Sequence, residues 1–303
     1  MKYFKSNGKL LLTGEYLVLD GAKSLALPTK YGQQLLVEPN QNQKICWRSY
    51  DENQSLWFED NFSIDAILKD GFTSPNEISQ RLIQILKSVQ ALNPSFFKHT
   101  EGFNIKTTQD FNRAWGLGTS STLINNIANW ANVDAYALLK FTFGGSGYDI
   151  ACAQHNSAIT YQIVGDRPLV NEVNFNPMFK DSIYFVYLNQ KQNSREGIAN
   201  YKKYKGDLKA PISDINSITQ HMISCSCFSE FENLIEKHER IISKIINQKP
   251  AKELLFPDFN GAVKSLGAWG GDFVLVISQD NPEAYFKSKG YETILPYSLM
   301  IKS

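Results

Sequence analysis

The chain has 303 residues, of which 43% are hydrophobic and 13% aromatic, enough for about two domains with a sizeable core. Its 31 basic and 30 acidic residues leave a formal net charge of +1, which gives no reason to expect nucleic acid or an anionic membrane as a partner. The sequence shows no signal-peptide pattern at its start and no uncharged apolar run near the roughly 18 residues of a membrane span.

The first sixty residues are predicted to be rich in β-strands. Short apolar or alternating runs are separated there by Gly, Pro, Asn or Asp: KLLLTG, EYLVLD, QQLLVEP, KICWRSY and QSLWFED. A helix is predicted over 75–91, where Ser74, Pro75 and Glu77 resemble a capping box with proline in the first turn. A strand over 103–111 then leads into a glycine-rich loop.

The rest of the chain mixes helices and strands. Helices are predicted over 120–131, over 134–142, as a pair within 211–247 and from near Pro282; strands are predicted over 157–165, 182–189, 272–278 and 291–296. The polar segment 165–181 is interpreted as a crossing between two halves. Because the order lacks regular β-α-β alternation, it favours an α+β fold over a doubly wound sheet.

The cysteines are predicted to be reduced thiols. They form no C-x-x-C pair, and the chain has only four histidines, so a metal site built from them is not expected; the cysteines are Cys46, Cys152, Cys225 and Cys227. A reduced, cytoplasmic protein is the simplest interpretation.

Residues 116–122 read GLGTSST and directly precede a helical pattern. The stretch lacks the spacing of a P-loop, and Ser121 stands where a dinucleotide-binding motif has its third glycine. Taken alone, it fits a plain strand-to-helix turn. It also suits an anion, because glycines allow close backbone approach and the free N–H groups of a helix start attract negative charge.

Three further stretches indicate that GLGTSST is more than a strand-to-helix turn. They are NGKLLLTGEYLVLDGAKSLALP (7–28), GGSGYDIA (144–151) and SLGAWGGDF (265–273). Together with GLGTSS, they resemble the signature motifs of the GHMP kinases, which include galactokinase, homoserine kinase, mevalonate kinase and phosphomevalonate kinase. The order and spread of the motifs cover nearly the whole chain. GSGYD and the terminal GGD resemble the phosphomevalonate kinase branch most, and the G-Y-D-I-A string resembles a Bacteroidetes-type group.

The resemblance implies a fold and a boundary. An N-terminal domain like ribosomal protein S5 domain 2 would bind ATP over residues 1–168, and a ferredoxin-like domain would follow over 169–303. ATP and substrate would meet in the cleft between the two domains.

The resemblance also implies catalytic residues. Asp149 would accept the proton of the attacking hydroxyl, a role that phosphoryl transfer assigns to a carboxylate. Lys9 would lower the pKa of this aspartate and polarise the attacking oxygen. The alternatives are an aspartate that caps the following helix and a solvated lysine at a strand start.

The resemblance also implies residues that bind ATP and the substrate. ATP would be held by the loop residues Gly116, Leu117, Gly118, Thr119, Ser120 and Ser121, and Ser120 would also contact Mg²⁺. The substrate side would include Glu15, Ser146, Gly147, Lys191, Ser194, Gly267, Ala268, Gly270, Gly271 and Asp272. For Glu15, orienting its neighbours is the favoured role; for the 190–197 segment, an exposed helix start is an equal alternative.

The sequence departs from the family pattern at several points. Asn112 replaces a proline before the loop, and the bulky Trp115 and Trp269 stand inside two glycine-rich segments. The indoles could narrow the pocket, stack on adenine or block the nucleotide. The region between Ser120 and Ser146 is about half the usual length, and Asp134 is the only carboxylate between Ser120 and Asp149.

The predicted function is therefore an ATP-dependent small-molecule kinase. Mevalonate or phosphomevalonate is the favoured acceptor by resemblance, so the partner would be a small alcohol or phosphate, and the protein would be a monomer or homodimer. A diphosphomevalonate decarboxylase is one alternative, although Gly118 argues against it. A non-catalytic metabolite sensor on the same fold is the other.

Overall fold

The computed structural model describes residues 1–69, 71–98, 101–192 and 194–302. The chain forms two compact units. Unit 1 comprises Met1–Gly8, Tyr31–Arg113 and Leu117–Gln154, and unit 2 comprises Lys9–Lys30, Ala114–Gly116 and His155–Ser303. The long strands β1 (Lys2–Leu11) and β2 (Ser24–Pro39) supply residues to both units. The domain boundary expected after residue 168 stays a prediction.

Unit 1 contains a mixed sheet with the strand order β4-β3-β5-β2. The strands in this order are β3 (Lys44–Tyr50), β4 (Leu56–Ser63), β5 (Phe103–Gln109) and residues 33–39 of β2, and β1 also pairs with β2. Within this order β3 runs parallel to β5, and the other two pairings are antiparallel. The alternation in KICWRSY buries Ile45 and Trp47 on one face, as the two-residue period of a strand requires.

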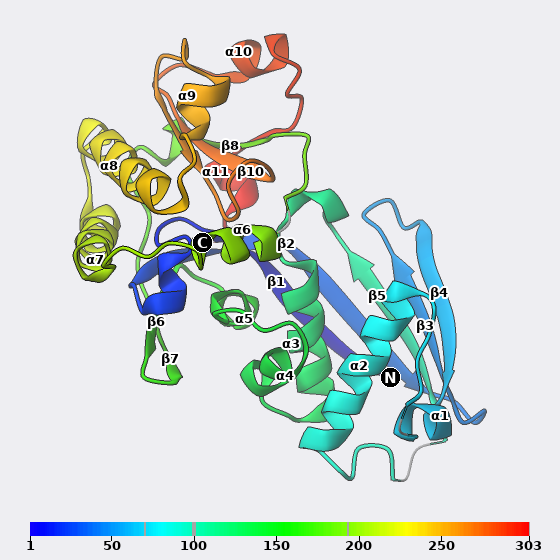
Figure 1. The fold of residues 1–303 in the computed structure, drawn as a ribbon. Coiled ribbons are helices and arrows are strands. Elements are labelled where there is room, and N and C mark those ends of the chain that lie inside the picture. Colours follow the sequence, from blue (N-terminus) through cyan, green and yellow to red (C-terminus); the bar gives the residue numbers. More distant parts are fainter. Residues whose placement is uncertain (70, 99–100, 193, 303) are drawn as a thin grey trace. The chain divides into compact units, whose positions relative to one another are not determined.

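Helices cover the buried face of this sheet (Figure 1). They are α1 (Ile64–Leu68), α2 (Glu77–Leu92), α3 (Thr119–Ala131), α4 (Ala135–Thr142) and α5 (Tyr148–Gln154). Leu86 of α2 and Ile127 of α3 share one core with Trp47. The predicted capping box at Ser74 is wrong, because the side chain of Asn76 accepts from the N–H groups of Ile78 (2.9 Å) and Ser79 (3.1 Å) instead.

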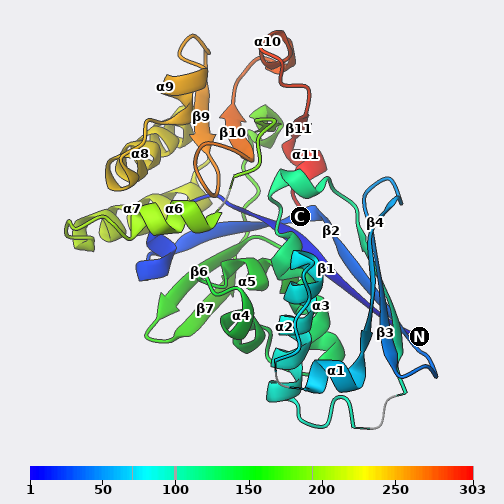
Figure 2. The same cartoon turned by 45° about the vertical axis from the view of Figure 1, so that its right-hand side comes forward.

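Unit 2 contains an antiparallel sheet with the order β11-β8-β10-β9 (Figure 2). Its strands are β8 (Ile183–Tyr187), β9 (Ala262–Ser265), β10 (Phe273–Ile277) and β11 (Ile294–Pro296). The segment from β8 to β9 contains α6 (Ser194–Tyr201), α7 (Lys209–Ser224), α8 (Phe228–Ile246) and α9 (Ala251–Leu255). α10 (Glu283–Ser288) links β10 to β11, and α11 (Tyr297–Met300) follows. This order of strands and crossovers is that of a ferredoxin-like domain, as predicted.

In unit 2, one local prediction is wrong and one segment contains a strand that was not predicted. EYLVLD was expected to be extended, but Leu17–Asp20 form a short 3₁₀ helix, because the chain turns at Gly14 and Tyr16, where φ is 86° and 64°. The segment 165–181 was expected to be a polar crossing, but it includes strand β7 (Arg167–Glu172). β7 pairs with β6 (Ile159–Val164), which in turn pairs with residues 24–26 of β2. β7 is mostly exposed, so its sequence carries little hydrophobic signal.

No helix in the described ranges has the combination of length and apolar character that crossing a membrane requires.

Candidate functional site

Three residues from distant motifs meet inside unit 2. Lys9 in β1 donates from Nζ to the carbonyl oxygen of Gly116 at 2.8 Å. Gly116 has φ of 67°, and a Cβ added there would lie 2.3 Å from the Asp272 carboxylate. This close approach requires glycine, so the turn at 116 is fitted to the carboxylate at 272.

Asp272 is the electrostatic centre of this group. Its Oδ1 accepts from the N–H of Gln192 at 3.1 Å, and its own N–H donates to the carbonyl of Gln190 at 2.7 Å. Burial raises the pKa of Asp272, and the N–H of Gln192 and the charges of Lys9 and Lys191 oppose that rise. Both predicted lysines therefore act on one carboxylate.

The glycine-rich segment before Asp272 is held tightly on the 190–192 segment. A Cβ on Gly271 would lie 2.7 Å from the Gln190 carbonyl, and the side chain of Gln192 donates to the Trp269 carbonyl at 2.7 Å. Gly267 and Gly270 have φ of 64° and 99°, and Ala268 is buried. Residues 190–192, at the start of the predicted segment 190–197, and the predicted segment 267–272 are therefore neighbours in unit 2.

The two tryptophans that depart from the family pattern pack within unit 2. The Trp269 indole is buried, and its N–H donor lacks a hydrogen-bond partner among the described residues. The backbone N–H of Trp269 donates to the hydroxyl of Tyr16 at 3.3 Å. Trp115 meets the ring of Phe273 edge-on, with centroids 5.6 Å apart. Both indoles thus pack against other residues of unit 2.

α6 is anchored to the first motif through aromatic rings. The ring of Tyr201 stacks on that of Tyr16 at 5.7 Å, and the Tyr201 hydroxyl donates to Asp20. A Cβ on Gly197 would lie 2.6 Å from the Tyr16 hydroxyl. Ser194 begins α6, but its side chain lies outside the described part of the chain.

Unit 1 holds the helix start predicted to bind phosphate. Gly118, with φ of 98°, precedes α3, and no side chain caps the helix there. Thr119 Oγ1 accepts from Gln109 (2.9 Å), and Ser121 Oγ donates to the Gly118 carbonyl (2.9 Å), whereas Ser120 is exposed. An α-helix without a side-chain cap presents N–H groups and the positive end of its dipole, which suit an anion. Leu117 is fully buried and anchors the loop.

Asp149 lies in the first turn of α5, also in unit 1. Gly147, with φ of 88°, precedes it, and the Gly147 carbonyl accepts from the N–H groups of Ile150 and Ala151. Asp149 Oδ1 accepts from the N–H of Ile150 at 3.1 Å. α5 packs against α3, so the helices that carry Asp149 and Ser120 are neighbours. Ser146, two residues before α5, is half-buried.

Several polar residues near these motifs were not singled out from the sequence. In unit 1, burial raises the pKa of Tyr136, and the charge of Asp149 adds to that rise. In unit 2, Glu15 is 1% exposed and forms an ion pair with Lys264, and its Oε2 lies 3.1 Å from His238 Nε2. Histidine on the apolar face of α8 is the signal that could have indicated this cluster, whereas the strand AVKS is too short for its burial to be predicted from the sequence.

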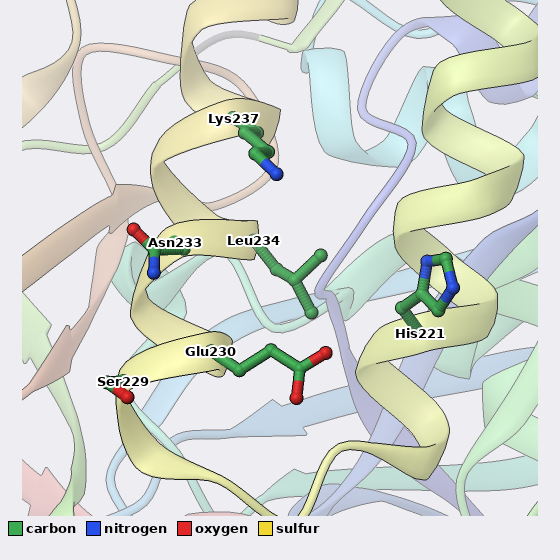
Figure 3. Close-up of a pocket in the computed structure, with 6 residues that line it drawn as sticks. All are labelled: His221, Ser229, Glu230, Asn233, Leu234 and Lys237. Atoms are coloured by element: carbon green, nitrogen blue, oxygen red, sulfur yellow. The ribbon is translucent and has the colours of Figure 1, made fainter.

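Unit 2 also carries a groove of about 590 Å³ between α7 and α8 (Figure 3). Its lining comprises His221, Ser229, Glu230, Asn233, Leu234 and Lys237. The residues predicted for phosphate, substrate and catalysis do not line this groove, so it is separate from the candidate site.

The described residues do not bring three His, Cys, Asp or Glu side chains together as a metal site. Mg²⁺ commonly binds through one or two protein ligands together with phosphate oxygens and water. The exposed Ser120 at the start of α3 fits that pattern and stays the predicted protein ligand.

One prediction follows from the contact at Gly116. Gly116→Ala should lower the free energy of unfolding by roughly 1–3 kcal/mol, because the added Cβ meets the Asp272 carboxylate and the residue keeps a left-handed conformation. Gly165→Ala is the matched control, since Gly165 has φ of 62° with nothing within 4 Å of an added Cβ. Urea denaturation measures both; equal losses would show that the carboxylate tolerates the methyl group.

Comparison with known proteins gives a match in structure alone. No family model and no curated protein sequence matches the chain. The mevalonate kinase of Methanococcus jannaschii matches with a TM-score of 0.72 at 15% identity, covering 100% of this chain and 98% of that one. Streptococcus pneumoniae phosphomevalonate kinase in complex with phosphomevalonate and AMPPNP matches with a TM-score of 0.70 at 15% identity, covering 95% of each chain. Lactococcus lactis galactokinase complexed with galactose matches with a TM-score of 0.66 at 13% identity, covering 100% and 95%. The chain therefore has the two-domain α+β fold of the GHMP small-molecule kinases.

Proposed function

We propose that the protein is an ATP-dependent phosphotransferase that acts on a small metabolite. The observation that carries the proposal is the meeting of Lys9, Gly116 and Asp272, three motif positions far apart in the chain, on the fold of the GHMP kinases. The α3 start without a side-chain cap adds a feature suited to a triphosphate.

The proposed roles follow from the chemistry of each group. When the acceptor is an alcohol, Asp149 accepts the proton of its attacking hydroxyl; a phosphate acceptor attacks through an oxygen that is already ionised. Lys9, held by the Gly116 carbonyl, stabilises negative charge on the transferred group. Ser120 and the N–H groups of the α3 start bind phosphate oxygens. ATP supplies the phosphoryl group, and Mg²⁺ neutralises charge on it.

For the acceptor we propose mevalonate or phosphomevalonate. Mevalonate kinase and phosphomevalonate kinase are among the structural neighbours, and the GSGYD and GGD strings resemble that branch. Galactokinase is also among the neighbours, so sugars belong in the test. We propose a place in the mevalonate pathway, within the G-Y-D-I-A group, and a cytoplasmic location, in line with cysteines that form no disulfide in the described part of the chain.

The test has two stages. Calorimetry with a non-hydrolysable ATP analogue and MgCl₂ measures nucleotide binding, and ADP release measures turnover with mevalonate, phosphomevalonate, diphosphomevalonate and a panel of sugars. Phosphorylated product supports the kinase. Release of CO₂ from diphosphomevalonate would indicate the decarboxylase, and metabolite binding without turnover would indicate the sensor.

Lys9→Met should lower kcat at least about tenfold, because the variant loses the positive charge and the hydrogen bond to Gly116. Lys2→Met is the matched control, since Lys2 is exposed on the same strand. Steady-state ADP release at saturating ATP compares the two variants. Equal rates in the wild type and Lys9→Met would remove this lysine from the reaction.

A further inference from the structure

A cluster of ionisable side chains is buried inside unit 2. Glu15 comes from the turn after β1, His238 and Glu239 from α8, and Lys264 from β9. Their exposed fractions are 1%, 0%, 3% and 0%, respectively. Three segments far apart in the sequence thus contribute ionisable side chains to one interior region.

The contacts join the first motif to the strand before the glycine-rich segment. Lys264 Nζ donates to Glu15 Oε1 and to the Ser265 carbonyl, the latter at 2.8 Å. Glu239 Oε2 accepts from the N–H (3.1 Å) and the hydroxyl (3.2 Å) of Ser265. His238 Nε2 accepts from the Gly14 N–H at 3.0 Å. The cluster therefore holds the turn at 14–15 and the end of β9 together.

The turn held by this cluster has a demanding backbone. Gly14 has φ of 86°, and a Cβ there would lie 2.1 Å from Ser24 Oγ. Tyr16 has φ of 64° and ψ of −51°, which is rare for a bulky side chain. Such conformations persist only where the surroundings over-determine them. The Glu15–Lys264 ion pair provides that constraint between the two positions.

The same turn supports the glycine-rich segment. The Tyr16 hydroxyl accepts from the N–H of Trp269, in the middle of the segment 266–272. The segment begins directly after Ser265, which the cluster also holds, and it ends at Asp272. The position of Asp272 beside Gly116 thus depends on two contacts: the hydrogen bond between Tyr16 and Trp269, and the hydrogen bonds that the cluster makes to Ser265.

Stability alone is a weak reason to bury these charges. Removing an ion pair from water carries a large desolvation penalty, and replacing such pairs by apolar residues is often neutral or stabilising. The contacts with Ser265 and the strained turn instead suggest a geometric role.

We propose that Lys264 is a positioning residue: by binding Glu15 it fixes the 14–16 turn and, through Tyr16 and Trp269, the segment that carries Asp272. The proposal rests on the proposed phosphotransferase function. Lys264 acts through its neighbours and does not touch the reactants.

The test uses the full-length double variant Lys264→Met/Glu15→Gln, in which neither partner leaves an unpaired buried charge. Kinetics give kcat and KM for ATP, and hydrogen exchange followed by mass spectrometry reports on peptides covering 266–272. We expect thermal unfolding near that of the wild type, faster exchange in 266–272, and kcat lower by about tenfold or more with little change in KM. Lys287→Met, which breaks the exposed pair with Glu283, is the control and should change neither readout.

In an active enzyme, only faster exchange together with lower kcat supports the proposal, and any other combination overturns it. If the wild type turns over none of the acceptors, the proposed function fails independently of this proposal. The exchange rate of 266–272 in the double variant, compared with that in the wild type, then decides whether Lys264 positions the segment. Should the double variant not fold, Tyr16→Phe removes only the hydroxyl that binds Trp269. Unchanged exchange in that variant overturns the proposal, and faster exchange supports it.

Discussion

Asp149→Asn should lower kcat by about 10²-fold or more, because an amide cannot accept the proton of the attacking hydroxyl. The substitution is nearly isosteric, and the amide oxygen can still accept from the Ile150 N–H, as Oδ1 does at 3.1 Å. Folding should therefore be unaffected, and thermal unfolding should match that of the wild type. ADP release at saturating ATP and acceptor gives the rate.

Asp134→Asn is the matched control for this prediction. Asp134 caps α4 by accepting from the N–H groups of Tyr136 and Ala137, and asparagine caps helices equally well. This control should keep the wild-type rate. If Asp149→Asn also keeps it, the general base is a different residue and the motif has only a structural role.

Within unit 2, three motif positions meet at Lys9, Gly116 and Asp272, whereas the local backbone is predicted less well. Glycines at 116 and 270–271 and the aspartate at 272 indicated close-packed turns, and the structure places Gly116 against Asp272. The residues that contact each turn cannot be predicted from its local sequence, however, because a contact such as Lys9–Gly116 joins residues 107 positions apart. That link came from resemblance to a family in which the motifs serve one site.

Local pattern fails where tertiary contacts set the backbone. EYLVLD reads as a strand because it is a short apolar run bounded by acidic residues, but Gly14 and Tyr16 adopt positive φ. This conformation depends on Ser24, His238 and Lys264, which come from other segments. Short elements such as α9 and β9 were missed for a related reason, because five or four residues give too little periodicity to detect.

Periodicity places only His238 of the buried cluster, on the apolar face of α8, and could not have predicted the other members. Lys264 lies in a strand that is buried at every position, where an apolar residue is the ordinary expectation. Glu239 follows His238 on a helix whose charged residues otherwise face solvent. Only the tertiary structure brings Glu15 close enough to Lys264 to offset the burial of both charges.

The pH dependence of stability should reveal Glu239. Burial raises the pKa of Glu239 to about 8, and the charge of Glu15 adds to the rise, while Lys264 and the Ser265 donors oppose it. The nearest approach of Lys264 Nζ to Glu239 is 3.9 Å, too long to outweigh burial. At neutral pH the folded protein therefore keeps Glu239 protonated, and the unfolded chain ionises it.

The direction in which the free energy of unfolding changes with pH follows from proton binding in the two states. Between pH 4.5 and about 8 the folded state holds a proton that the unfolded state has lost, so the free energy of unfolding falls as pH rises through this window and levels off above it. At 1.36 kcal/mol per pKa unit, the full loss is roughly 4–5 kcal/mol. Glu239→Gln stays neutral at every pH and avoids this loss, while its amide oxygen can still accept from Ser265.

Urea denaturation of the wild type and Glu239→Gln at pH 5, 6, 7 and 8 measures the effect. The variant should be close to the wild type at pH 5 and more stable by roughly 2–5 kcal/mol at pH 8. Burial lowers the pKa of His238, which weakens both proteins alike at the acid end, so the difference between them isolates Glu239. Glu283→Gln, on an exposed side chain, is the control and should give a flat difference. A difference for Glu239→Gln that does not change from pH 5 to 8 would mean that this carboxyl is already ionised in the folded protein, with Lys264 as its counter-charge.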